Sequence, residues 1–344
     1  MAYAAISKPG LHFNTKLYTG NGSTQSITGV GFQPDFIWGK NRSATGSHNL
    51  CDVVRGATKI IYSNLTDGEA TDSNSFTSFD SDGFSIGSQS NINGNGNNIV
   101  TWNWKAGGAG SANSDGATAS TVSVNNTAGF SIVKWTGTSG NTTVGHGMNT
   151  APVFTIVKNY GGSGMNWIVY HKAISPDYAI KLNTADGQSN SNNYWQSTAP
   201  TNSLLTFTGN TASNSNGNNM IGYCFAEKKG FSKFGSYTGN GNTDGTFVYT
   251  GFKPALVILK HSNSNGNNWR IIDNKRDPDN VTQKELYPST NDAEGSADRM
   301  DLLSTGFKLR SSGSPVNDGE YIYAAFAEEP LVANVGQSIP ATAR

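Results

Sequence analysis

Two acidic pairs are the first residues to consider as metal ligands or as a catalytic acid and base. Asp80 and Asp82 have the alternate spacing that begins many calcium loops. Because no further acidic residue closes that loop at the expected distance, a polar hairpin turn is favoured, and a metal site is the weaker alternative. Glu328 and Glu329 could resemble the carboxylates of a glycosidase, which lie on either side of a cleft. Their position at the end of the last apolar run favours solvated side chains instead.

Histidines and glycine-rich turns offer no stronger sign of catalysis. The five histidines have neither metal-ligand spacing nor an HExxH pattern. The run Gly20-Asn21-Gly22 does not open a helix, so it indicates a turn rather than a phosphate-binding loop. We therefore predict that the protein is not an enzyme and has no cofactor. The histidines are His12, His48, His146, His171 and His261.

The densest charge cluster falls between Asp273 and Asp279 and includes Lys275, Arg276 and Asp277. A salt-bridge network on a surface loop is the favoured interpretation. Docking to a partner protein is the alternative.

An aromatic pair with polar neighbours is the best candidate for sugar binding. Tyr194 and Trp195 follow Asn193 in a run that does not resemble a strand. Aromatic faces stack on ring-shaped ligands, and an asparagine side chain can bind hydroxyl groups. These three residues are the candidate ligand-binding site, although packing of the two rings onto the fold is favoured over it.

Composition excludes several classes of protein. The 344 residues carry 24 basic and 24 acidic groups, so a neutral chain without basic clusters is a poor candidate for nucleic-acid binding. No apolar stretch has the length of a membrane helix, and residues 1–10 do not resemble a secretory leader. The many aromatic residues argue against disorder. Cys51 and Cys224 are predicted to be two buried thiols rather than a disulfide.

Internal repeats organise the chain. The run Tyr18–Gly22 returns nearly unchanged as Tyr237–Gly241, and Trp135–Thr138 is a degraded copy between them. Each copy continues to a proline, an apolar strand and a lysine six residues after the proline. These three strands are Pro34–Lys40, Pro152–Lys158 and Pro254–Lys260.

The copies divide the chain into β-rich units. We predict repeats at residues 1–107, 128–229 and 230–329, with a linker at 108–127 and an extended tail at 330–344. Small residues dominate the linker, so proteolysis is expected there first, which would leave the second and third repeats together.

Short β-branched and aromatic runs separated by Asn-Gly and Asp-Gly turns predict an all-β fold. Each repeat is expected to form an antiparallel β-sandwich of the lectin or jelly-roll kind. Successive side chains of a strand point to opposite faces, so every second side chain of the proline-led strands is expected to face a core. Either the residues below or those that alternate with them form this set. The predicted core residues are Phe36, Trp38, Phe154, Ile156, Leu256 and Ile258.

Several of these motifs together resemble a family of bacteriophage virion proteins that is common in phages of aquatic bacteria. The resemblance covers most of the chain, is strongest in the first and third repeats, and brings no catalytic residues. It implies a structural protein of the tail-fibre-like or lectin-like kind. The segments that carry it are Tyr18–Ile27, Gly31–Trp38, Asp52–Gly56, Asp82–Phe84, Trp102–Ala106 and Phe326–Pro330.

The resulting hypothesis is a non-enzymatic virion structural protein made in the host cytoplasm. A tail-fibre or adhesin component that contacts host surface glycans is preferred. A capsid decoration protein is the alternative, and a glycan-active enzyme is the less favoured third. Expected partners are other virion proteins, further copies of the chain and host polysaccharide, without nucleic acid or membrane. The apolar tail residues Leu331, Val332, Val335 and Ile339 are predicted to dock on a neighbouring subunit.

Overall fold

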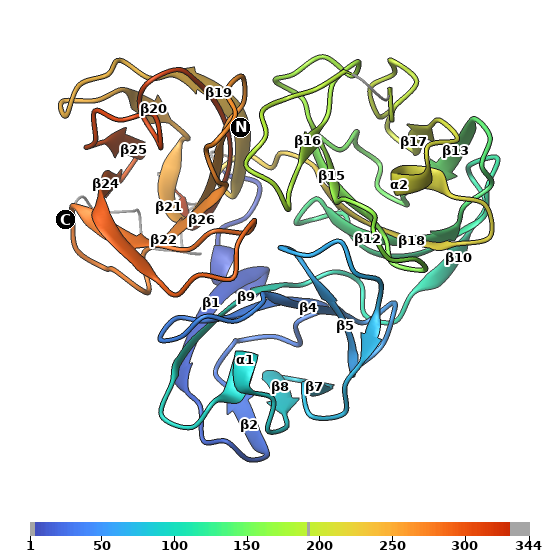
Figure 1. Ribbon diagram of the computed structural model, residues 1–344, viewed down its shortest axis with the longest axis horizontal. Coiled ribbons are helices and arrows are strands. Elements are labelled where there is room, and N and C mark those ends of the chain that lie inside the picture. The colour runs from blue at the N-terminus through green and yellow to red at the C-terminus, as the bar shows by residue number, and fades with distance from the viewer. Residues whose placement is uncertain (1–3, 191–192, 331–344) are drawn as a thin grey trace.

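The computed structural model describes residues 4–190 and 193–330 and confirms the all-β class. Strands make up 44% of the chain and helices 3%, and all of the paired strands in the sheets are antiparallel. Three lobes surround a common centre (Figure 1). We call them lobe 1 (residues 4–107), lobe 2 (108–190 and 193–229) and lobe 3 (230–330).

Lobe 1 contains a short 3₁₀ turn, η1 (Pro9–Leu11), before its first strand and has a larger and a smaller sheet. The larger sheet has the order β1-β9-β3-β4-β5-β6, and the smaller one β2-β8-β7. The elements are β1 (Phe13–Thr19), β2 (Gln25–Thr28), β3 (Phe36–Asn41), β4 (Asn49–Asp52), β5 (Lys59–Tyr62), β6 (Ala70–Thr71), β7 (Phe76–Asp80), β8 (Gly83–Ile86), α1 (Ser90–Asn93) and β9 (Asn98–Trp104).

Lobe 2 has a seven-stranded sheet of order β10-β11-β12-β18-β14-β15-β16 and a two-stranded sheet β13-β17. Its elements are β10 (Ser111–Asn113), β11 (Ser120–Asn125), β12 (Phe130–Thr136), β13 (Thr142–Gly145), β14 (Phe154–Asn159), β15 (Ile168–His171), β16 (Ile180–Lys181), β17 (Leu204–Phe207), α2 (Thr211–Asn214) and β18 (Asn219–Phe225).

Lobe 3 has two four-stranded sheets, β19-β26-β21-β22 and β20-β25-β24-β23. Its strands are β19 (Ser232–Thr238), β20 (Phe247–Tyr249), β21 (Phe252–His261), β22 (Arg270–Asp273), β23 (Thr282–Glu285), β24 (Gly295–Leu303), β25 (Gly306–Leu309) and β26 (Glu320–Pro330). The central strand orders β1-β9-β3-β4, β12-β18-β14-β15 and β19-β26-β21-β22 correspond, so equivalent residues can be assigned from strand pairing.

The proline-led strands β3, β14 and β21 are buried along their whole length. All six predicted core residues lie in one hydrophobic core that the three lobes share. Their alternate neighbours, such as Ile37, Val157 and Val257, lie instead in the separate cores of the lobes. Each of these strands therefore belongs to a middle layer, which explains why its sequence is a continuous apolar run.

An aromatic cluster marks the centre of the shared core. Trp104, Phe225 and Phe326 lie at equivalent positions of strands β9, β18 and β26, and their ring centroids are 5.6–6.1 Å apart. Because the three positions are equivalent, the three lobes, which lie around a common centre in Figure 1, have a pseudo-threefold arrangement.

The predicted linker at 108–127 is wrong, because it contains two strands that are paired in the sheet of lobe 2. β10 pairs with β11, and β11 pairs with β12 along its full length. A Cβ on Gly107 would lie 2.6 Å from the carbonyl oxygen of Val124, and one on Gly116 would lie 2.5 Å from that of Thr143. Small residues serve close backbone packing here rather than flexibility.

The N-terminal segment joins lobe 1 to the junction between lobes 2 and 3. Ala4 and Ile6 are buried, and the amide of Ala5 donates to the carbonyl of Lys229 at 2.8 Å. The tail residues Leu331, Val332, Val335 and Ile339 lie outside the described residues. Within the described ranges, we find no helix with the length and apolar character needed to cross a membrane.

Candidate functional site

The predicted sugar platform is not supported by the positions of its side chains. Trp195 is buried and contacts the rings of Tyr170 and Phe207 at 5.8 and 5.6 Å. Asn193 uses its side-chain oxygen to accept from the amide of Ser197. Stacking on a sugar needs an exposed ring face, so Trp195 acts as core packing instead.

Tyr194, the third member of that set, is also mostly buried but borders solvent. It lines a cavity of about 290 Å³ together with Lys181, Asp186 and Asn265, at the edge of the contact between lobes 2 and 3. Tyr194 and Trp195 therefore both belong to the lobe 2 core, and Tyr194 lies at the edge of that core, where it lines the cavity.

The acidic pair Asp80 and Asp82 forms a hairpin turn. Asp82 accepts hydrogen bonds from the amides of Gly29 and Gly31, and these bonds lower the pKa of its carboxyl group. Asp80 accepts from the hydroxyl groups of Ser78 and Ser85. Among the residues that the structure describes, no three His, Cys, Asp or Glu side chains lie close enough together to hold a metal ion.

The two cysteines are buried and free, as predicted. Burial raises the pKa of Cys51 and of Cys224 to about 12, so both remain protonated thiols at neutral pH.

The prediction of a surface network at Asp273–Asp279 is partly wrong, because Asp273 and Arg276 are fully buried where lobe 3 meets lobe 1. The contacts between lobes contain several buried polar side chains. We call them seam 1–2, seam 2–3 and seam 3–1 after the lobes that meet.

Each seam is bridged by a loop from one lobe and a buried lysine of the other. Lys158 donates to the carbonyl of Thr66 at 3.0 Å in seam 1–2, and Lys260 donates to that of Ala185 at 2.9 Å in seam 2–3. In seam 3–1, Lys40 and the carbonyl of Asn291 are 3.4 Å apart.

These lysines are the residues six positions after each repeat's proline. Burial lowers the pKa of each ammonium group to about 8. A buried lysine of lowered pKa can serve as a nucleophile. Here every Nζ atom is enclosed and donates to carbonyl oxygens of its own lobe as well. The geometry therefore favours a structural role for the three lysines.

Tryptophan side chains reinforce two of the seams. Trp167 of lobe 2 donates to the carbonyl of Tyr62 in lobe 1, and Trp269 of lobe 3 donates to that of Lys181 in lobe 2, both at 2.9 Å. His48 occupies the equivalent position in lobe 1. Among the described residues, its Nε2 atom has no hydrogen-bond partner of good geometry, and burial holds its pKa well below the ordinary value.

Seam 1–2 encloses an ion network. Arg55 contacts Asp52 at 2.6 Å and Glu69 at 3.2 Å, and the Arg55 and Asp52 side chains are fully buried. The hydroxyl group of Tyr223, from lobe 2, donates to Asp52 at 2.8 Å. Its ring stacks on Phe36 of lobe 1 with centroids 4.1 Å apart.

Seam 3–1 repeats this network with different donors. Arg276 contacts Asp273 at 2.6 Å and Glu294 at 3.1 Å. The indole of Trp102, from lobe 1, donates to Asp273 at 3.0 Å, in the place of Tyr223. Arg42 of lobe 1 adds a second ion pair to Glu294 at 2.8 Å.

Seam 2–3 has neutral residues at the same three positions. Strand pairing makes His171 equivalent to the two aspartates, so Ile174, three residues later, takes the place of the arginines. Gln188 takes the place of the glutamates, because its amide, like theirs, donates to the carbonyl two residues after the buried lysine of the neighbouring lobe. Ala324 of lobe 3 takes the place of Tyr223 and Trp102, and its side chain has no hydrogen-bond donor. His171 supplies the donor instead, and its Nε2 atom lies 3.1 Å from the carbonyl oxygen of Tyr323.

The tautomer of His171 follows from its second bond. Its Nδ1 atom accepts from the amide of Ala173, so the proton resides on Nε2. Burial lowers the pKa of this histidine to about 4.

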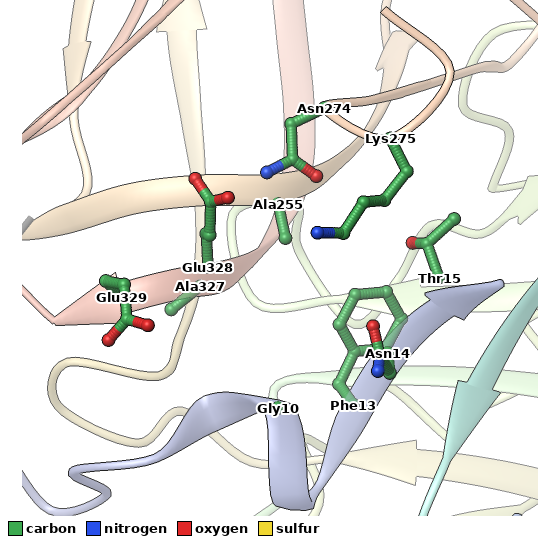
Figure 2. Close-up of a pocket in the computed structure, with 10 residues that line it drawn as sticks. All are labelled: Gly10, Phe13, Asn14, Thr15, Ala255, Asn274, Lys275, Ala327, Glu328 and Glu329. Atoms are coloured by element: carbon green, nitrogen blue, oxygen red, sulfur yellow. The ribbon is translucent and has the colours of Figure 1, made fainter. Parts of the chain in front are cut away.

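Seam 3–1 also contains a cavity of about 250 Å³ (Figure 2). Thr15 and Asn274 are each 6% exposed, and their Oγ1 and Oδ1 atoms have no hydrogen-bond partner within the described residues. In Figure 2 the Lys275 ammonium also extends toward this space, with the Phe13 ring beside it. Glu328 and Glu329 line the cavity, which the sequence did not indicate.

A ring of three interlocked all-β lobes is thus the class of structure that this chain defines. A family described as a domain of unknown function (DUF7483) matches residues 8–330, and the chain belongs to that family. No curated protein and no solved structure matches it.

Proposed function

We propose that the protein is a non-enzymatic structural subunit of a bacteriophage virion. Within the particle it serves as a tail-fibre or adhesin component that contacts host surface glycans. The sequence motifs shared with phage virion proteins support the assignment to a virion.

The observation that carries the proposal is the closed ring of lobes. A head-to-tail arrangement of like units that closes cannot grow into a filament. The chain is therefore a stiff triangular plate, and we place it at a tip or joint rather than along a fibre shaft. Buried hydrogen-bonded networks across the seams supply the rigidity that such a part needs.

The second candidate, a capsid decoration protein, is favoured by the pseudo-threefold shape. A single chain with three similar lobes can occupy a threefold position on a shell, where each lobe meets an equivalent neighbour. Both candidates require outward contacts from all three lobes, and they differ in where the subunit sits and in how many copies a particle holds.

Labelling of purified particles tests the proposal. Gold-conjugated antibodies against the chain should decorate the tail end of each particle at low copy number, and quantitative mass spectrometry should give the same count. Dense labelling of the head would favour the decoration role. Absence of the protein from purified particles would refute the virion assignment.

An assay for hydrolysis tests the non-enzymatic part. We expect the purified protein to release no reducing ends from host polysaccharide. Release of reducing ends would show that the chain is a glycan-active enzyme.

A further inference from the structure

The cavity in seam 3–1 differs from the equivalent places in the other two seams. Backbone hydrogen bonds make Asn274 equivalent to Val53 and Lys172. The amide of each donates to the carbonyl of the residue directly after its repeat's proline. Strand pairing makes Thr15 equivalent to Ile132 and Phe234. Seams 1–2 and 2–3 thus place larger apolar residues where seam 3–1 has Thr15.

Seam 1–2 fills this place with apolar side chains, because Ile132 lies in the shared core and Val53 packs against it. Seam 2–3 fills it with the Phe234 ring of the shared core and with ion pairs, since Glu227 contacts Lys172 at 2.6 Å and Lys233 at 2.9 Å. Neither solution leaves a polar atom of these residues buried without a partner.

Seam 3–1 leaves two such atoms, and both border the same cavity. An unpaired buried polar group costs about 1–3 kcal/mol, so a native site that has two of them calls for a partner. Asn274 Oδ1 needs a donor, whereas the Thr15 hydroxyl can donate or accept. A ligand with several hydroxyl groups satisfies both.

The charges around the cavity are balanced. Glu328 is paired with Lys253 at 2.8 Å, and the remaining carboxylate, Glu329, is offset by the Lys275 ammonium group. A neutral polar ligand fits this lining better than an ion does. The volume of about 250 Å³ lies below the roughly 300–1,000 Å³ of pockets for drug-sized ligands, and it suits one sugar ring.

We propose that this cavity between lobes 3 and 1 binds a single neutral sugar unit of a polysaccharide. Asn274 and Thr15 bind its hydroxyl groups, Lys275 and Glu329 bind it at the rim, and the Phe13 ring provides apolar contact. The inference deepens the proposed function and rests on it only for the biological source of the sugar.

Titration of the full-length protein with methyl glycosides of neutral hexoses, followed by ligand-observed NMR, tests the site. We expect millimolar binding of at least one neutral hexoside and at least tenfold weaker binding of the corresponding uronate. Thr15→Ile and Asn274→Val copy the residues of seam 1–2 and should each weaken binding at least tenfold. Lys172→Val, at the matched position in seam 2–3, is the control and should leave it unchanged.

Lys275→Ala keeps the test valid if the two buried variants fail to fold. Its side chain is exposed, and Ala173 is the natural residue at the matched position of lobe 2, so the protein should stay folded and bind at least threefold more weakly. Failure of every neutral hexoside to bind would mean that the cavity holds only water. Binding that none of the three cavity variants weakens would place the sugar elsewhere, and either result overturns the proposal.

The outcome is independent of the virion assignment. Sugar binding by a protein that is absent from particles would refute the proposed function and leave the site intact. If the protein is present in particles but binds no sugar, the proposed sugar site is refuted and the virion assignment stands.

Discussion

Seams 1–2 and 2–3 join their lobes with the same backbone geometry, but seam 1–2 buries an ion network where seam 2–3 has neutral residues. In both, a buried lysine donates to a loop carbonyl of the neighbouring lobe, and a tryptophan donates to the carbonyl at the end of a strand of that lobe. Around them, seam 1–2 buries an arginine between two carboxylates, whereas seam 2–3 has His171, Ile174 and Gln188.

This difference shows that strand register determines which side chains contact each other across a seam. The residue types at those positions determine the free energy that their burial costs. Burial of an ion network costs the hydration energy of its charges, and only ion pairs and hydrogen bonds of good geometry offset that cost. A neutral histidine avoids that cost but makes the seam sensitive to acid. Four experiments can separate these effects.

Removal of the arginine should have the largest effect. Arg276→Met leaves Asp273 and Glu294 without their buried partner, so we expect a loss of about 3–5 kcal/mol in the free energy of unfolding, measured by urea denaturation. Arg55→Met should behave alike in seam 1–2. Ile174→Met at the matched position of seam 2–3 should cost less than about 1.5 kcal/mol, because it conserves volume. Equal losses at all three positions would show that the ion networks contribute no more than packing.

Acid should weaken seam 2–3 through His171. The pKa of His171 is about 4 in the folded chain and 6.5 in the unfolded one, so protons bind the unfolded state first as the pH falls. Its contribution to stability is complete above pH 6.5 and is lost between pH 6.5 and 4. At about 1.4 kcal/mol per pH unit, the loss reaches about 3 kcal/mol.

A comparison with His171→Gln isolates that contribution. Glutamine can still donate to the carbonyl of Tyr323 but does not titrate, so its stability should fall less steeply with acid in urea unfolding at several pH values. His48 and His146, whose pKa values are also lowered by burial, are present in both proteins and cancel. Parallel pH curves for the two proteins would contradict this assignment.

Transfer of the aspartate into seam 2–3 should have a smaller effect. His171→Asp removes the donor to Tyr323 and buries a carboxylate beside Ile174, so we expect a loss of about 2–3 kcal/mol at neutral pH. The double variant His171→Asp with Ile174→Arg should recover part of that loss, as shown by its thermal midpoint. A double variant less stable than the single one would mean that seam 2–3 cannot accept the network of seam 1–2.

The bonds that both seams share should give the smallest effect. Trp167→Phe and Trp269→Phe each remove one indole hydrogen bond across a seam and should cost about 1–2 kcal/mol. Near-equal values in thermal unfolding would support a common scaffold beneath the two kinds of electrostatics. A much larger loss at one seam would show that the scaffold itself differs.

The sequence by itself determined the all-β class, the core strands and the buried thiols. The run from Phe36 to Lys40, with its counterparts, has the composition of strands buried on both faces. Cys51 and Cys224 are apolar in behaviour and lie in such strands. These properties follow from local composition and periodicity, which depend on few distant contacts.

Local composition also misled in two places. The small residues at 108–127 resemble a flexible linker, but they allow strands β10 and β11 to lie close to neighbouring backbone. Tyr194 and Trp195 stand among polar neighbours, yet Trp195 lies in the core of lobe 2. In each case the deciding contact comes from residues far along the chain.

Only the tertiary structure determined which polar side chains are buried and what they contact. Lys40 and Asp273 would be solvated in an isolated repeat, and each is buried with a partner that another lobe supplies. The cavity beside Thr15 and Asn274 likewise exists because two lobes meet there with side chains too small to fill the space. Burial of a polar group depends on a partner from elsewhere in the chain, and sequence spacing within one repeat contains no record of that partner.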